Sequence, residues 1–142
     1  MLCDFLRKQW LAKRATFTFE TVMSHESKLE ILRQARLLGY RTYMYFVCTD
    51  DAEINRRRVS ARERDGGHGV SRGKIIARYR RSLNLLPRAI ALCDRAYLFD
   101  NSEAGEKGHR WVAEFERGKL IRVSREPPGW LVRALRAGRK SR

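Results

Sequence analysis

The chain has 142 residues, of which 43% are hydrophobic, and a formal net charge of +15. This length suits one folded domain with a modest core, and the hydrophobic fraction excludes a disordered tail. No stretch approaches the roughly 20 apolar residues of a membrane span, and no apolar secretion signal opens the chain, so we expect a cytoplasmic protein without membrane partners.

Arginine supplies most of the positive charge. Seven of the 31 cationic side chains are lysines and the other 24 are arginines. A guanidinium can bind phosphate or carboxylate through two parallel hydrogen bonds, so this bias favours contacts with such anions. It is also typical of nucleic-acid-binding proteins and of arginine-rich genomes, and composition does not separate these explanations. We expect non-specific, salt-sensitive binding to polyanions.

The cysteines do not form a metal-binding pattern. Cys3, Cys48 and Cys93 are odd in number and far apart, and the chain has no CxxC pair or His/Cys cluster. We therefore expect a reducing compartment, with Cys48 and Cys93 as small buried side chains, and no metal site.

The first two thirds of the chain predict alternating helices and strands. Strict alternation of Phe17 and Phe19 with polar residues predicts a strand at 16–20. The nearly continuous apolar run at 42–48 predicts a strand covered on both faces, and 96–99 a further short buried strand. Helices are expected over 3–14, from Ser24 to a stop at Gly39, from a capping box of Asp50 and Glu53 to about Arg64, and from Ser71 to a bend or break near Pro87.

This order predicts an α/β fold with parallel strands over 16–101. The chain then changes character. Segments 111–115 and 119–123 flank Arg117 and Gly118 and predict a β-hairpin, and a short basic helix is expected at 130–137.

Two arginine pairs flank a glycine-rich turn. Arg58 and Arg62 lie one helical turn apart before Gly66, Gly67 and His68. On the following helix, arginines at 78 and 81 lie opposite an apolar stripe. The pairs could form a lid that closes over phosphates, or an ordinary solvated basic face, and spacing alone favours neither. Arg56 and Arg57 are expected to face solvent.

Polar residues follow each predicted parallel strand, where open α/β sheets bind ligands. Glu20, beside Thr21, could bind a magnesium-bridged phosphate or accept a proton, but could equally favour the start of the next helix. Asp50 is expected to cap a helix. Asp100 and Asn101, which precede Ser102, predict a turn of the kind that often borders a nucleotide base.

Common catalytic motifs are absent from the sequence. It contains no GxxxxGK[ST] phosphate loop, GxSxG elbow or HExxH motif. The arginine pairs therefore predict a lid without the backbone cradle that holds the β- and γ-phosphates.

Five sequence blocks in one colinear order resemble the zeta-toxin-like family of P-loop kinases and ATPases. The blocks are FETVMS (19–24), GYRTYMYFV (39–47), RV with GGH and V (58–70), KIIARYRRSL (74–83) and FDNS (99–102). The resemblance covers about two thirds of the chain. It implies a three-layer P-loop fold with a parallel sheet that here lacks its first strand and phosphate loop. Residues 1–102 would be this partial kinase domain, and 103–142 a basic extension of hairpin and helix.

The resemblance also implies ATP-dependent phosphoryl transfer with Mg²⁺, in some members to a UDP-amino sugar and in a toxin–antitoxin pair. Glu20 and Thr21 match the family's substrate-side strand end and are the expected catalytic residues. The expected ATP-binding lid consists of Arg58, Arg62, Arg78 and Arg81, and the expected nucleotide-proximal loop of Asp100 and Asn101.

The departures from the family pattern limit this assignment. Gly69 and Ser71 replace the usual residues of GGHDVP, and the Walker A strand and loop are missing, which should leave a gap beside strand 42–48. Three interpretations remain: a kinase fragment inactive alone, a basic nucleic-acid-binding or regulatory remnant, and one half of a split kinase. The expected partners are accordingly an antitoxin or a complementing Walker A polypeptide, and ATP binding by this chain alone is not expected.

Overall fold

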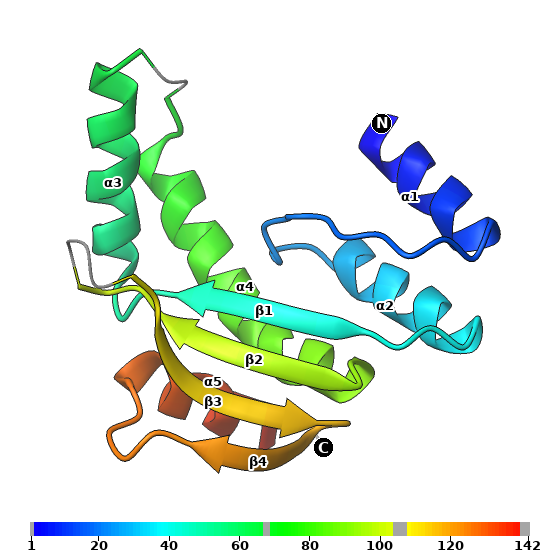
Figure 1. The fold of residues 1–142 in the computed structure, drawn as a ribbon. Helices are drawn as coiled ribbons and strands as arrows, with labels where there is room; N and C mark the ends of the chain where they lie inside the picture. The colour runs from blue at the N-terminus through cyan, green and yellow to red at the C-terminus, as the bar shows by residue number, and fades with distance from the viewer. Residues whose placement is uncertain (1, 67–68, 104–107, 140–142) are drawn as a thin grey trace.

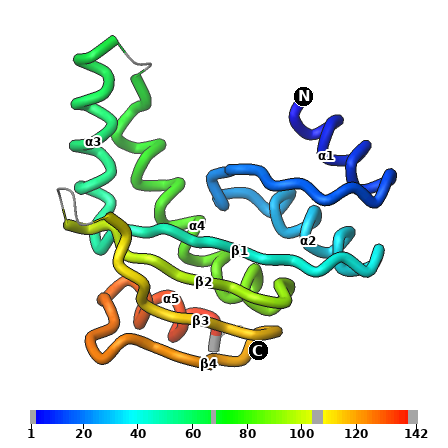
Figure 2. Tube along the Cα trace, viewed as in Figure 1, coloured from blue at the N-terminus to red at the C-terminus, as the bar shows by residue number. Residues whose placement is uncertain are grey.

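The computed structural model describes residues 2–66, 69–103 and 108–139. In this part of the chain, five helices accompany one four-stranded sheet (Figures 1 and 2). None of these helices is long and apolar enough to cross a membrane. In chain order the elements are α1 (Leu2–Ala12), α2 (Ser27–Leu37), β1 (Tyr43–Cys48), α3 (Ala52–Arg64), α4 (Arg72–Leu92), β2 (Arg95–Asp100), β3 (Arg110–Glu116), β4 (Lys119–Val123) and α5 (Gly129–Arg139).

The sheet is open and mixed, in the order β1–β2–β3–β4. β1 and β2 form the parallel pair that the sequence predicts, with Tyr43 opposite Arg95 and Cys48 opposite Asp100. β3 and β4 form the predicted hairpin, but β3 also pairs antiparallel with β2. The chain is therefore an α/β protein in which the residues after 102 extend the same sheet, so the sheet is not parallel throughout.

The hairpin turn follows from the two residues that form it. Arg117 has a φ of 45° and Gly118 a φ of 82°. Positive φ at both central residues is the geometry of the two-residue turns that match the right-handed twist of paired strands. Glycine adopts this conformation without strain, so Gly118 supports the tight connection.

The strand expected at residues 16–20 is not formed, which corrects the sequence prediction. These residues lie in an irregular segment between α1 and α2 (Figure 1). The alternation is real, because the rings of Phe17 and Phe19 stack with centroids 6.1 Å apart, and Phe17 also contacts Trp10 and Tyr40. However, no backbone hydrogen bond joins the described residues 15–24 to β1. Without a neighbour to pair with, an alternating segment cannot become a strand.

Helices cover only one face of the sheet. α4 and α5 lie together behind it in Figure 1, and α2 packs on α4. The core consists of side chains from these helices and from the covered face of the strands, including Leu29, Leu86, Leu98, Val112 and Trp130. Along β1, exposed and buried residues alternate, so the expectation of a strand covered on both faces is wrong. β2 likewise alternates between partly exposed and buried residues.

Two predicted helix starts are displaced by a few residues. α3 is capped by Asp51, whose carboxylate accepts a hydrogen bond from the Glu53 N–H at 3.0 Å, and not by Asp50. α2 begins after Glu26, which makes no side-chain capping bond, so Ser24 is not its cap. The predicted stop at Gly39 is confirmed by its φ of +78°, which ends the helix in the left-handed region.

α4 is a continuous helix of 21 residues that contains Pro87, so the expected break does not occur. Ser71 precedes the helix as predicted but makes no side-chain capping bond. A proline removes one helical hydrogen bond and strains the preceding turn. Here its ring packs directly on α5, because a Cβ added to Gly138 would lie 2.6 Å from the Pro87 Cβ. The close approach of the two helices therefore requires glycine at position 138.

Replacing Gly138 with alanine is expected to destabilise the protein, although alanine is the better helix former. The added methyl group would collide with Cβ and Cγ of Pro87. Overpacking of this kind costs about 1–3 kcal/mol, which outweighs a gain of up to about 1 kcal/mol in helix propensity. Urea denaturation should show a lower free energy of unfolding for Gly138→Ala than for the parent.

Gly73→Ala is the matched control, because a Cβ at this position in α4 meets nothing within 4 Å. This variant should be at least as stable as the parent. Equal stability of the two alanine variants would contradict the close packing of α5 on α4.

Candidate functional site

The carboxyl ends of the parallel strands β1 and β2 carry a connected polar cluster. The Ser102 hydroxyl donates to Asp100 Oδ1 at 2.6 Å and accepts from the Asp50 N–H at 2.7 Å. The Asn101 N–H donates to the carbonyl oxygen of Cys48 at 2.7 Å. The residues that follow the two strands are therefore tied to each other, as expected for neighbouring parallel strands. Asp100 is the last residue of β2 and Asn101 follows it, so the expected turn begins one residue later than predicted; a role beside a nucleotide stays a prediction.

Both aspartates of this cluster hold the start of α5. The Trp130 indole N–H donates to Asp100 Oδ1 at 3.1 Å, and the Trp130 backbone N–H donates to Asp50 Oδ1, also at 3.1 Å. Arg133 donates to the Asp50 carbonyl oxygen at 2.8 Å. Trp130 is fully buried and Asp100 is 7% exposed. The prediction that Asp50 caps α3 is therefore wrong; its carboxylate instead accepts a hydrogen bond at the start of α5.

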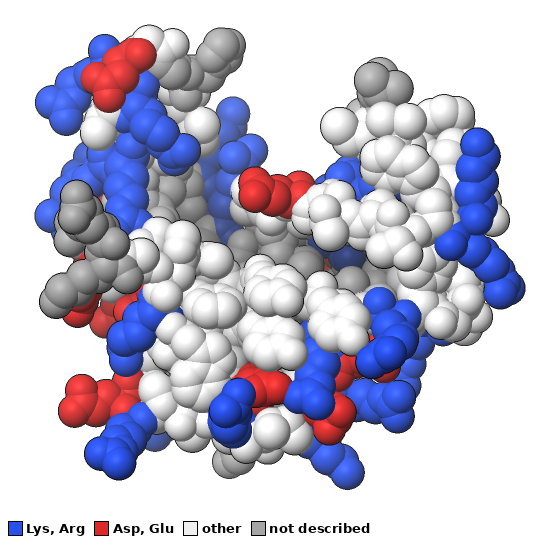
Figure 3. Space-filling model, in the orientation of Figure 1, with Lys and Arg blue, Asp and Glu red and all other residues white. Residues whose placement is uncertain are grey.

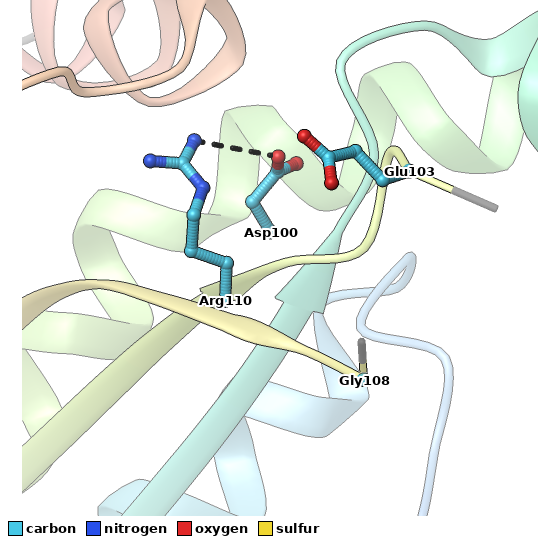
Figure 4. A pocket seen from close by; sticks show the side chains of 4 residues that line it. All are labelled: Asp100, Glu103, Gly108 and Arg110. Atoms are coloured by element: carbon cyan, nitrogen blue, oxygen red, sulfur yellow. Dashed lines mark ion pairs between the residues drawn. The ribbon is translucent and has the colours of Figure 1, made fainter. Parts of the chain in front are cut away.

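A cavity of about 360 Å³ opens beside this cluster. Its described lining is formed by Asp100, Glu103, Gly108 and Arg110 (Figure 4). Figure 4 shows the carboxylates of Asp100 and Glu103 and the guanidinium of Arg110 directed toward the same space, with Arg110 Nη2 at 3.6 Å from Asp100 Oδ2. Two carboxylates and one guanidinium do not make a phosphate cradle. The oxygens of Asp100 are already engaged by Ser102, Trp130 and Arg110, which leaves Glu103 as the carboxylate without a described partner in this lining.

The predicted lid arginines lie on the hairpin of α3 and α4, which extends beyond β1 in Figure 1. Arg58 Nη2 donates to the Glu103 carbonyl oxygen at 3.2 Å, and Arg81 Nε donates to that of Ser24 at 3.1 Å. Arg62 and Arg78 are exposed. The structure thus brings Arg58 to the loop after β2 and leaves Arg62 and Arg78 open to solvent. Gly66 has a φ of +92°, whereas Gly67 and His68 lie outside the described residues.

Tyr79 fixes the hairpin against the strand ends. Its hydroxyl donates to the Thr49 carbonyl oxygen at 2.9 Å and lies 3.1 Å from that of Asp50. Burial, followed by the nearby Cys48, raises the pKa of Tyr79 to about 12. Burial also raises the pKa of Cys48 to about 12. Both groups stay protonated near neutral pH, so neither is poised to act as a base or nucleophile.

Glu20 and Thr21 are not brought into the polar cluster. Both are exposed in the irregular segment between α1 and α2. In Figure 3 this side of the molecule is hollowed between the α3–α4 hairpin and the N-terminal segment, with Lys and Arg on the hairpin wall. Of the predicted lid arginines, Arg81 contacts the segment that carries Glu20 and Thr21, through the Ser24 carbonyl oxygen.

Sequence reasoning missed the polar roles of Tyr79 and Trp130. Tyr79 is recognisable in the sequence only as a member of the apolar stripe of α4, and Trp130 only as the start of a short helix. Their partners are 30 residues away or more, with Thr49 bound to Tyr79 and Asp100 bound to Trp130. A buried Tyr or Trp needs a polar partner, which is the one general signal the sequence offers.

The described residues do not fit a complete site for ATP and Mg²⁺. Among them, no three His, Cys, Asp or Glu side chains gather into a possible metal site. The arginines could contact phosphates, but the sequence has no GxxxxGK[ST] loop whose N–H groups would hold the β- and γ-phosphates.

Comparison with known proteins identifies no relative. No family model, curated protein or solved structure matches the chain.

Replacing Asp100 with alanine is expected to destabilise the fold. The change leaves the buried Trp130 N–H without an acceptor, which costs about 1–3 kcal/mol. Asp100→Asn keeps an oxygen in reach of this donor and should retain most of the stability. Urea denaturation of both variants tests this. Equal losses would show that the negative charge beside Arg110 matters, rather than the acceptor.

Proposed function

We propose that this chain is part of a zeta-toxin-like kinase fold, an ATP-dependent phosphotransferase that uses Mg²⁺ and is inactive without a phosphate loop from another segment or polypeptide. The observation that carries the proposal is the position of the α3–α4 hairpin, which bears the predicted lid arginines. α3 leaves the carboxyl end of β1, and Tyr79 of α4 returns to the same end. Open α/β sheets bind their ligands at this end of parallel strands.

The free edge of β1 supports the proposal from a second direction. β1 pairs with β2 only, and on its other side the described chain provides no strand. The irregular residues 15–24 lie on that side without pairing (Figure 1). An unpaired edge of this length is a template for another strand. A parallel strand paired with this edge of β1 would have its carboxyl end beside Thr49. A phosphate loop that follows such a strand would then face the α3–α4 hairpin.

The proposal assigns different roles to the exposed arginines and to those bonded to backbone carbonyls. Arg62 and Arg78, which are exposed, would contact phosphate oxygens, whereas Arg58 and Arg81 would hold the hairpin through their bonds to backbone carbonyls. Glu20 would serve the substrate side, across the hollow, with Thr21 beside it. Asp100 and Asn101 would border the nucleotide. Because the described residues supply neither a metal group nor a cradle, no step of phosphoryl transfer is derived from them.

The proposal implies particular partners and a setting. The first proposed partner is a polypeptide or segment that carries the Walker A motif, as in a split kinase. The resemblance to the zeta-toxin-like family suggests an antitoxin as a second partner. The proposed use of ATP favours an activity in the cytoplasm.

The purified chain is expected to show no Mg²⁺-dependent turnover of ATP above background. Phosphoryl transfer depends on positioning and charge stabilisation by the phosphate loop and its metal, and the sequence contains no such loop. A radiolabelled ATP hydrolysis assay checks this. Turnover by the chain alone would contradict the proposal, and turnover that persisted in Glu20→Ala would also remove the assigned role of Glu20.

Fusing the Walker A segment of a zeta-toxin relative ahead of Cys3 is expected to produce an ATP-binding protein with turnover. In this chimera, Arg78→Ala should lower kcat by about 10²-fold, because it removes a charged donor from the phosphates. The free energy of unfolding should change by less than about 0.5 kcal/mol, since Arg78 is exposed.

Arg57→Ala is the matched control, because Arg57 is an exposed arginine of α3 that has no proposed contact with phosphate. It should leave kcat unchanged. If the two variants lose activity equally, the hairpin is only a solvated basic surface.

A further inference from the structure

The face of the sheet opposite α4 and α5 is lined by aromatic side chains. On β1, Tyr43, Tyr45 and Val47 are 49%, 68% and 47% exposed. Tyr45 lies opposite Tyr97 of β2, and Val47 lies opposite Phe99. Phe99 in turn lies opposite Trp111 of β3. We call this surface the aromatic face; it comprises Tyr43, Tyr45, Val47, Tyr97, Phe99 and Trp111.

The rings of the aromatic face are arranged in near-parallel pairs. Tyr45 stacks on Tyr97 with ring centroids 5.2 Å apart and on Phe99 at 6.4 Å, with interplanar angles of 19° and 21°. All members except Val47 are aromatic, whereas a surface that packs on another protein layer usually carries branched aliphatic residues. Flat rings exposed on a sheet are the groups on which unpaired nucleic-acid bases stack.

Arginines lie next to these rings. The Arg122 guanidinium carbon is 5.5 Å from the centre of the Trp111 ring, and Arg95 lies opposite Tyr43. Both arginines pair with the buried carboxylate of Glu114, and their hydrogen bonds, that of Arg122 first, lower its pKa. The Arg122 side chain nevertheless stays 70% exposed. Figure 3 shows the uncharged surface bordered by Lys and Arg, with Asp and Glu side chains between them.

The charge of the whole chain favours the same kind of ligand. A net charge of +15 attracts polyanions and makes their binding depend on salt. Charge alone would serve a duplex equally well. A duplex, however, keeps its bases stacked inside, so it cannot use the exposed rings, whereas a single strand can place bases on the rings and phosphates on the arginines.

We propose that the aromatic face binds single-stranded nucleic acid, whose bases stack on Tyr45, Tyr97 and Phe99 while its phosphates contact the surrounding arginines. This activity goes beyond the proposed kinase function. It also uses a different surface, because the kinase proposal rests on the α3–α4 hairpin and on the free edge of β1. Recognition by stacking is tolerant of sequence, because every base has a flat face. The carboxylate opposite Tyr97, that of Glu114, is already paired with Arg95 and Arg122.

The test measures fluorescence anisotropy of a labelled oligo(dT) of about 12 nucleotides, a length within the usual range for one such surface. Tyr45→Leu keeps an apolar side chain but removes the ring, and should raise Kd about tenfold, as should Tyr97→Leu. Affinity of all proteins should fall with salt between about 50 and 200 mM. A dA·dT duplex should bind more weakly than the single strand and should be insensitive to both substitutions.

Phe5→Leu is the matched control, because Phe5 is 58% exposed on α1, away from the sheet. It should bind oligo(dT) as the parent does. Equal affinity of Tyr45→Leu and Phe5→Leu would overturn the proposal and leave only non-specific charge attraction. Circular dichroism of each variant checks that a loss of binding is not a loss of fold.

Photocrosslinking gives an independent readout that needs no substitution. A 5-bromodeoxyuridine oligonucleotide should crosslink to peptides that contain Tyr45 or the Tyr97–Phe99 segment. Crosslinks confined to α3 and α4 would overturn the proposal. It would also be overturned if sedimentation showed a dimer that the substitution Tyr45→Arg dissociates, because a second copy of the chain would then cover the aromatic face. Either result leaves the ATP assays unaffected, so the two proposals fail separately.

Discussion

The arrangement of this molecule depends on the contacts of one buried residue, Trp130. Its side chain lies in the core beside Phe46, its indole N–H binds Asp100 and its backbone N–H binds Asp50. One residue thereby joins α5 to the ends of both parallel strands. Ser102 closes the network between the two aspartates. Buried polar groups are costly when unpaired, so each partner here determines the position of the others.

This network also explains why the cluster at the strand ends is largely structural. Asp50 and Asp100 stand where a ligand-binding sheet would present its polar groups, yet their carboxylates are already bound to α5. The groups that remain available are peripheral, namely Glu103, Arg110 and the arginines of the hairpin. Any chemistry at this end must therefore come mainly from side chains around the cluster.

A second constraint is that all the packed helices lie on one face of the sheet. α4 contains the core stripe of Leu83, Leu86 and Ile90, and α5 packs alongside it. With both helices on one side, the opposite face and the free edge of β1 are left without cover from the described chain. The two open surfaces differ in chemistry. The edge offers backbone hydrogen-bonding groups, which suit a strand, and the face offers rings, which suit flat ligands.

Sequence patterns predicted local structure well where the signal was local. The strand at Tyr43–Cys48, the helical period of α4 and the Arg117–Gly118 turn are conformations that neighbouring residues determine, and the structure confirms them. The coverage of that strand on both faces depended on distant segments, and it was predicted wrongly. The prediction failed at residues 16–20 because a strand also needs a partner, and the alternating pattern cannot show whether one exists. The same limit applies to the site, where the arginine spacing was visible but the contacts of Tyr79 and Trp130 were not.

The distribution of acidic residues explains where the excess positive charge is concentrated. At the sheet, the carboxylates are matched by arginines: Glu114 pairs with Arg95 and Arg122, and Asp94 lies beside Arg117. Hydrogen bonds lower the pKa of both acids, those from Arg122 most for Glu114 and that from the Thr42 N–H most for Asp94, so these charges persist at neutral pH.

On the α3–α4 hairpin, acidic side chains compensate the arginines less completely. Glu53 pairs with Arg56 and Arg72 at its base, while Arg62 and Arg78 extend into solvent. An excess of like charges repels itself and opposes the compact state. A bound phosphate group would relieve that repulsion, so the residues that make the hairpin electrostatically costly are those that would gain most from an anionic ligand.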